Sequence, residues 1–171
     1  MESKPHKYDP EFSPKVSKKR AAAVREMFGI EIDGMTILQA QAMLRDIVDC
    51  SLGLAVLPAS EQQKKVLERF GSLCPPSRRQ ASAELKAIFS SLNFEVVAIE
   101  NLAPGVQVIH VNDRNKVLEM GPLDKKGNAT FRCGATSCTP RMLRRHRPDG
   151  DYSNTGIPEH YFKNGWLNPV A

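Results

Sequence analysis

The chain has 171 residues, a net charge of +5 and the composition of a globular protein, with 41% hydrophobic and 25% charged residues. This length suits one ordinary domain or two small ones. No stretch approaches the roughly 20 apolar residues of a membrane helix, and the start MESKPHKYDPEF lacks the apolar core of a signal peptide. Its 4 cysteines are too few for a disulfide framework, so we expect an intracellular, cytoplasmic protein without membrane attachment.

A block of helical sequence occurs twice in the first half of the chain. TILQAQAMLRDIV (36–48) and SRRQASAELKAIF (77–89) share Gln, two Ala, Leu and Ile at equivalent positions. Upstream of these blocks, VREMFG (24–29) matches VLERFG (66–71) in the same order and at nearly the same spacing. Two matching blocks in one order indicate a duplicated structural unit.

Local signals begin and end helices at equivalent places in the two copies. The second helix of each copy opens with a Ser/Thr-x-x-Gln capping box, and the first helix of each copy ends at a glycine that can take the left-handed conformation. The boxes are Thr36 with Gln39, Ser77 with Gln80 and, at a first helix, Ser60 with Gln63; the glycines are Gly29 and Gly71. Each copy is therefore expected to be a helical hairpin.

These hairpins predict a domain of four helices at 16–92, after an irregular arm at 1–15 that contains Pro5, Pro10 and Pro14. The apolar stretch between the copies, SLGLAVLPAS (51–60), is expected to be a buried connector or a helix extension that stops at its proline.

The first copy, AAAVREMFGIEIDGMTILQAQAMLRDIV, resembles the SAP motif, a short helix–loop–helix module, over residues 21–48, with a second copy at 60–89. The matching apolar and glycine positions are Phe28, Gly29, Ile30, Gly34 and Leu44. The resemblance implies DNA binding through a basic second helix. In the first copy that helix holds Arg45 beside two aspartates, whereas the second copy offers Arg78, Arg79 and Lys86.

The period of the hydrophobic pattern changes after residue 92. Strand-like segments are NFEVVAIENL (93–102), VQVIHV (106–111), KVLEM (116–120) and a run around Phe131, and TPRMLRR (139–145) is expected to be a short helical turn. Short strands between frequent turns are typical of a small barrel or sheet. The sequence thus predicts an α+β fold, in which duplicated helical hairpins precede a small antiparallel β-barrel or sheet at 93–147 and an irregular aromatic tail at 148–171.

Residues 100–147 resemble a small barrel of the Tudor or KOW type. Leu102, Pro104, Gly105 and Val108 match the opening L-x-P-G-x-x-V of such barrels, and the segment 140–143 matches the helical turn before their last strand. The resemblance implies binding of RNA, DNA, peptides or proteins, and does not choose among them.

Arginines gather near the end of the predicted barrel. Arginine forks match phosphate geometry, so the cluster favours nucleic-acid binding; an acidic protein surface or an ordinary solvated face are the alternatives. Its members are Arg132, Arg141, Arg144, Arg145 and Arg147.

Aromatic residues mark the polar tail. So many aromatics in such a segment indicate docking onto a surface, either the chain's own or that of a protein partner. They are Tyr152, Tyr161, Phe162 and Trp166.

Signals for metal or catalysis are weak. Four potential zinc ligands, Cys133, Cys138, His146 and His160, have spacings that fit no standard zinc finger. Cys138 with His146 is the one local nucleophile–base pair worth naming, and the Asp149–Asp151 pair equally fits a turn. Without a phosphate loop, dinucleotide fingerprint or zinc-protease helix, we expect no enzyme activity, no metal and no cofactor.

The leading hypothesis is a non-enzymatic nucleic-acid-binding or regulatory protein. It would use the arginine-rich barrel edge and the basic second hairpin. The alternative is a protein-binding inhibitor or assembly subunit, of the kind found in viruses or mobile elements, that contacts its partner through the helical repeat and the aromatic tail.

Overall fold

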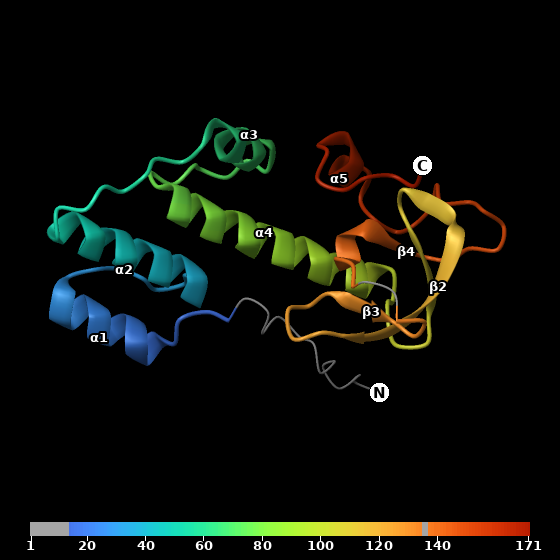
Figure 1. The fold of residues 1–171 in the computed structure, drawn as a ribbon, viewed down its shortest axis with the longest axis horizontal. Helices are drawn as coiled ribbons and strands as arrows, with labels where there is room; N and C mark the ends of the chain where they lie inside the picture. Colours follow the sequence, from blue (N-terminus) through green and yellow to red (C-terminus); the bar gives the residue numbers. More distant parts are fainter. Residues whose placement is uncertain (1–13, 135–136) are drawn as a thin grey trace. The chain divides into compact units, whose positions relative to one another are not determined.

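The computed structural model describes residues 14–134 and 137–171 (Figure 1). Its secondary structure is mixed, with five α-helices and a four-stranded antiparallel sheet in these ranges. The described residues divide into two compact units, one ending at Phe89 and the other covering Ser90–Ala171. We call them the helical unit and the sheet unit. In the described ranges, no helix has the length and apolar character needed to cross a membrane.

The helical unit contains α1 (Lys18–Phe28), α2 (Ile37–Ser51), α3 (Glu61–Arg69) and the first part of α4 (Arg78–Ile99). The capping boxes predicted before α2 and α3 are both formed, with the serine or threonine oxygen and the glutamine side chain each accepting from a backbone N–H. At the start of α4, Ser77 Oγ accepts from the Gln80 N–H at 3.0 Å, while the Gln80 side chain donates to Asp46 of α2. That glutamine therefore joins two helices.

The chain ahead of α1 pairs with the start of α2, and the chain ahead of α3 pairs with the start of α4. Pro14 accepts from the N–H of Ile37 at 2.8 Å, and Leu57 accepts from the N–H of Arg78 at 2.8 Å. Isolated bridges next to these bonds join Lys15 to Thr36 and residue 58 to residue 77. Most of the predicted arm, 1–15, lies outside the described residues.

The prediction of a buried connector between the copies is wrong. Helix α2 ends at Ser51, and the segment that follows runs over the surface, with Leu52 68% exposed, Leu54 56% and Leu57 58%. The physical reason is the small interior of the hairpins. The buried cluster around α3 and α4 consists of Ala59, Leu67 and Ala81, so Ala59 is the one residue of the segment 51–60 that this interior takes in.

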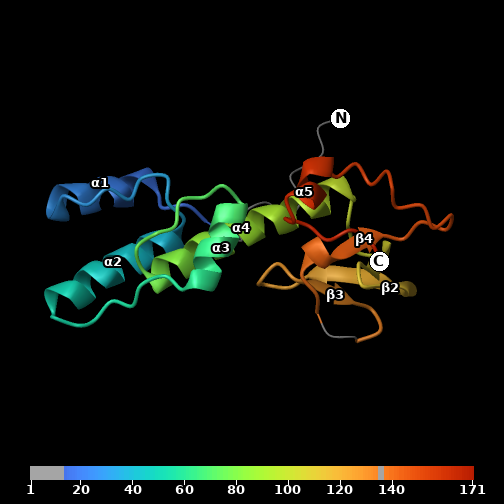
Figure 2. The same ribbon diagram turned by 90° about the horizontal axis from the view of Figure 1, so that it is seen from above.

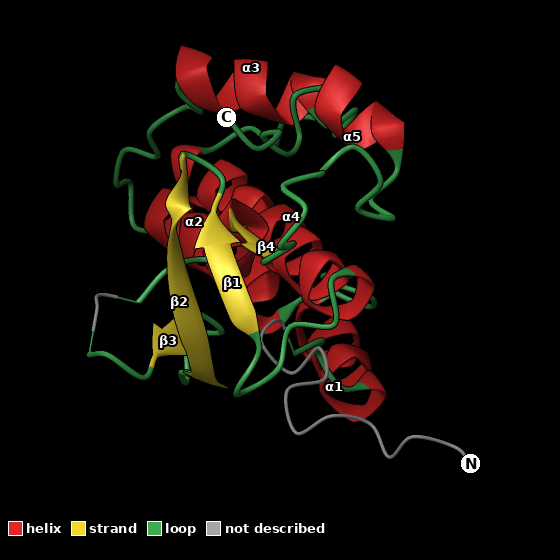
Figure 3. Ribbon diagram, turned by 90° about the vertical axis from the view of Figure 1, so that its right-hand side faces the viewer, coloured by secondary structure: helices red, strands yellow, loops and turns green. Residues whose placement is uncertain are grey.

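The sheet unit is built on β1 (Gln107–His110), β2 (Asp113–Leu123), β3 (Ala129–Phe131) and β4 (Leu143–Arg145). The spatial order is β3-β2-β1-β4, so the sheet is open, and β1 pairs antiparallel with both β2 and β4 (Figure 3). The predicted strands at 106–111, 116–120 and around Phe131 are confirmed. A 3₁₀ turn at Pro140–Met142 precedes β4, in the place where a helical turn was expected.

The predicted strand at 93–102 is wrong, because α4 continues to Ile99. Leu92 and Val96 lie four residues apart on one helical face, are 5% and 0% exposed, and Val96 belongs to the core of the sheet unit. Packing of that face outweighs the strand preference of the local β-branched residues. The helix ends at Ile99, and Asn101, just beyond it, has a left-handed φ of 50°. The Leu102 N–H bonds to the Val97 carbonyl at 2.9 Å, which completes a Schellman cap.

The C-terminal tail docks onto its own unit. It contains α5 (Glu159–Lys163), and its Ile157 and Leu167 belong to the buried core beneath the sheet. The last residue, Ala171, donates its N–H to the Val111 carbonyl at 2.8 Å. Sequence alone left open whether the tail covers its own surface or a partner's.

Candidate functional site

Arg144, at the centre of the predicted phosphate-binding cluster, is fully buried. Its guanidinium donates to the carbonyl oxygens of Arg141, Leu143 and Asn168 at 3.0, 2.7 and 2.8 Å. Burial lowers the pKa of Arg144 to about 10, and the opposite charge of Glu100 acts in the other direction. The side chain ties β4 to the tail, so its visible role is structural.

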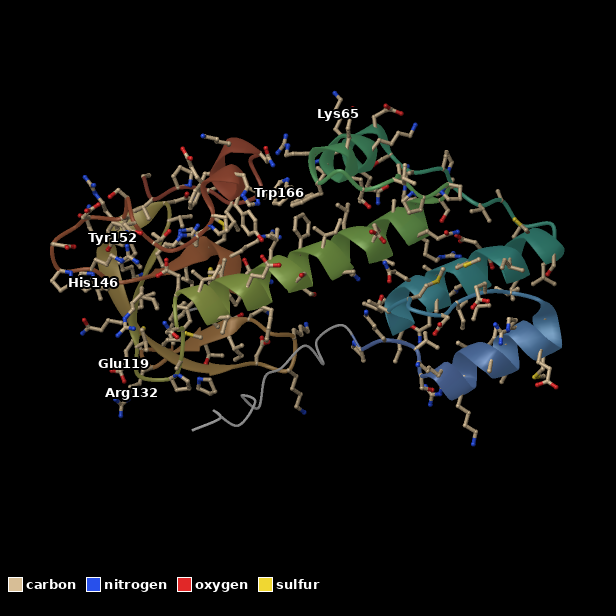
Figure 4. All side chains as sticks on the ribbon, turned by 180° about the vertical axis from the view of Figure 1, so that it is seen from behind. Lys65, Glu119, Arg132, His146, Tyr152 and Trp166 are labelled. Carbon is tan, nitrogen blue, oxygen red and sulfur yellow. The ribbon has the colours of Figure 1, made fainter. Side chains whose placement is uncertain are left out.

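The remaining arginines of the cluster differ in burial and in their contacts. Arg132 forms an exposed ion pair with Glu119 across β2 and β3 at 2.7 Å (Figure 4). Arg147 donates to the Asn154 carbonyl at 2.7 Å. Arg145 is exposed at the end of β4, and Arg141 is half-buried, which lowers its pKa. The structure therefore does not gather these five side chains on one open surface.

The tail aromatics that sequence singled out contact their own unit. The hydroxyl of Tyr161 donates to Glu95 on α4, which raises the pKa of Tyr161. The Tyr161 and Trp166 rings lie 5.1 Å apart between centroids. Phe162 lies beside the Arg144 guanidinium, 5.9 Å away, and the Tyr152 hydroxyl accepts from the Arg147 backbone N–H at 3.3 Å.

The helical unit brings basic side chains from both hairpins together. Helix α2 lies beside the first part of α4, as Figures 1 and 2 show and as the bond from Gln39 to Glu84 confirms. Between them runs a groove of about 250 Å³, which we call the α2/α4 groove. Its lining consists of Leu38, Gln41, Ala42, Arg45, Arg79, Ser82, Ala83 and Lys86. The predicted residues Arg79 and Lys86 thus share a surface with Arg45, which was not among the predicted site residues.

Arg79 is already paired. Its guanidinium lies 2.7 Å from Asp46 and 2.9 Å from Asp49, while 42% of its side chain remains exposed. Arg78 is exposed beside it and lines an adjoining hollow of about 370 Å³ whose apolar wall is Ala55, Val56 and Leu57. Charge and apolar surface therefore lie next to one another on this face.

Large apolar side chains are unusually exposed on the helical unit, a feature that sequence reasoning missed. Their exposed fractions run from 40% to 92%. They are Met27, Phe28, Leu38, Ile47, Val48, Leu52, Leu54, Leu57 and Leu73. The available signal was the apolar composition of the connector 51–60.

Cys138 lacks the features of an activated nucleophile. Burial raises the pKa of its thiol, whereas an activated cysteine nucleophile has a lowered pKa. In the described ranges, no group of three or more His, Cys, Asp or Glu side chains is placed to hold a metal ion. Asp149 and Asp151 accept from the backbone N–H groups of Asp151 and Ser153 at 3.1 and 2.8 Å, as turn residues do.

Comparison with known proteins gives no relative from which a role can be carried over: no family model, no curated protein and no solved structure matches this chain.

Proposed function

We propose that this chain is a non-enzymatic protein-binding module that contacts its partner through the helical unit. The observation that carries the proposal is the exposure of the connector leucines, Leu52, Leu54 and Leu57, each more than half exposed. Exposed apolar patches bordered by polar residues are typical of protein interaction sites. The adjoining arginines fit this reading, because arginine is enriched at such interfaces.

The duplication is part of this proposal. We propose that the two hairpins are copies of one unit, which supplies a rigid pair of helices for the contact. The equivalent backbone bonds of Pro14 with Ile37 and of Leu57 with Arg78 support it. So do the matching caps at Thr36 and Ser77.

A triple substitution of the connector leucines to serine tests the proposal. We expect affinity capture from an extract of the source cells to lose at least one partner that the unchanged chain retains. The free energy of unfolding should stay within about 0.5 kcal/mol per site, because the side chains are exposed.

Val117→Ser is the matched control, since Val117 is 40% exposed and lies on β2 of the sheet unit. An identical set of captured proteins for the triple variant and the unchanged chain would count against protein binding through this surface.

Nucleic-acid binding is the second candidate. Residues 13–89 contain 12 basic and 8 acidic side chains, and Arg45, Arg79 and Lys86 line one groove. A gel-shift titration across salt concentrations tests it with duplex and single-stranded probes. Absence of binding at about 50 mM salt, where phosphate contacts are strongest, would exclude this candidate.

A further inference from the structure

The lining of the α2/α4 groove has an internal symmetry. The sequence repeat places Gln39 equivalent to Gln80, a shift of 41 positions. Under the same shift the eight lining residues fall into four pairs, with none left over. The pairs are Leu38 with Arg79, Gln41 with Ser82, Ala42 with Ala83, and Arg45 with Lys86.

Contacts between the two helices show their relative direction. Gln39 bonds to Glu84, and Asp46 accepts from Ser77, so α2 and α4 run antiparallel. Antiparallel equivalent helices exchange places by a rotation of 180° about an axis between them. Gln41 and Ser82 lie where that local axis passes, and Arg45 and Lys86 take equivalent places on its two sides.

Small residues form the floor of the groove and basic residues its flanks. Ala42 and Ala83 are each 5% exposed, while Leu38 remains 43% exposed at the same surface. Arg45 and Lys86 are exposed, and no carboxylate belongs to the lining. The hollow beside Leu57 shares Arg79 and Ser82 with the groove and extends its apolar surface.

The combination of a small apolar floor and basic flanks favours an amphipathic peptide over a nucleic acid as the ligand of this groove. A phosphate backbone would use the basic flanks but leave the apolar floor unused. An amphipathic helix lays its apolar face into a groove through residues at i, i+3, i+4 and i+7. Flanking carboxylates on such a helix would complement Arg45 and Lys86.

We infer that the α2/α4 groove binds an acidic amphipathic helix of a protein partner. The inference rests on the proposed protein-binding function and names the surface and the partner's chemistry. Because each copy supplies one of the two basic residues, Arg45 and Lys86, the groove uses a position that the hairpins share.

The test begins with a displayed library of amphipathic helical peptides, with varied charges flanking the apolar face, selected on the full chain. We expect selected peptides to be enriched in glutamate and aspartate. Their affinity, measured by fluorescence anisotropy, should fall at least about tenfold for the double variant Arg45→Glu, Lys86→Glu. A peptide with lysines in place of its acids should regain binding to that variant.

The matched control is Lys19→Glu, Lys65→Glu, which makes the same charge change on exposed residues of α1 and α3 outside the groove lining. Figure 4 labels Lys65 on α3. It should change the affinity less than about twofold, as distant exposed charges do. Circular dichroism of both double variants checks that they remain folded.

Four outcomes would overturn the inference: no enrichment of any peptide, enrichment without acidic bias, equal loss in both double variants, or displacement of the peptide by duplex DNA. Peptides that bind but respond only to the connector serine substitutions would overturn the groove assignment and leave the proposed function intact. If no peptide binds and no partner is captured, both the groove inference and the proposed protein-binding function are wrong.

Discussion

At the scale of single residues, Arg144 shows that an arginine in a basic cluster can bond to backbone carbonyl oxygens in the interior. Its position in β4 turns its side chain away from the Leu143 side, and the tail covers it. A buried guanidinium satisfied by carbonyl oxygens is a structural tie, and its removal leaves those oxygens without a donor.

We predict that Arg144→Leu lowers the free energy of unfolding by about 3 kcal/mol, because three carbonyl oxygens lose a charged donor. Urea denaturation measures the change. Arg145→Leu, at the exposed neighbour, should cost less than about 0.5 kcal/mol. Equal effects of the two substitutions would show that Arg144 is not the structural tie described here.

Tyr161 gives a prediction for alkaline pH. Its bond to Glu95 raises its pKa above the ordinary 10.0, so the folded state holds this proton more tightly than the unfolded state. The resulting stability is fully present below pH 10.0 and is lost as the pH rises from there through the raised pKa. Tyr161→Phe should therefore lower the stability near neutral pH and make its decline above pH 10.0 less steep.

Denaturation midpoints measured at a series of alkaline pH values test this prediction. Tyr152→Phe serves as the comparison, because the Tyr152 hydroxyl accepts from a backbone N–H instead of donating to a carboxylate. Parallel alkaline declines for the unchanged chain and Tyr161→Phe would refute the role of the Glu95 bond.

At the scale of elements, Ser77 caps α4 and also bonds to a neighbouring helix, whereas the Ser60 side chain caps α3. Both side chains cap a helix, but Ser77 is 2% exposed and also donates to Asp46 of α2. The start of α4 is thus fixed by α2 as well as by its own cap.

We predict that Ser77→Ala costs about 2 kcal/mol of stability, whereas Ser60→Ala costs about 1 kcal/mol, the usual value of a cap. Thermal or urea unfolding of the two variants tests the difference. A double-mutant cycle with Asp46→Ala should show a coupling above about 0.5 kcal/mol for Ser77, and additivity would rule out the inter-helix contribution.

At the scale of the whole molecule, the buried core is unevenly distributed. Among the described residues, the cluster in the sheet unit has nine buried members, including Val108 of β1, whereas the cluster at α1 and α2 has three. Within α1 the buried residue is Ala21. Local opening free energies follow such differences in buried contacts.

We therefore predict that amides of β1 exchange hydrogen most slowly and those of α1 among the fastest of the described helices. Val108 and Ile109 are both fully buried and lie in a strand paired on both sides. Hydrogen exchange followed by mass spectrometry measures this order. Protection of α1 equal to that of β1 would contradict it.

The sequence by itself determined the features that depend on a few neighbouring residues. Thr36 with Gln39 and Ser60 with Gln63 marked two helix starts, and Gly29 and Gly71 lie just past the ends of α1 and α3, both with left-handed φ. Alternation of apolar residues located β1, whose pairing on both sides the pattern alone did not specify. Local signals suffice here, because caps and strand periods act within a few residues.

The tertiary structure alone decided what depends on distant contacts. Residues 93–99 are helical because Val96 packs into the core of the sheet unit. Arg144 is buried because the tail covers it, with its guanidinium bonded to the Asn168 carbonyl. The tertiary structure also brought Arg45 and Lys86 to one groove by placing α2 antiparallel to the first part of α4. The spacing of a repeat makes two residues equivalent in sequence, but only packing decides whether they line the same groove.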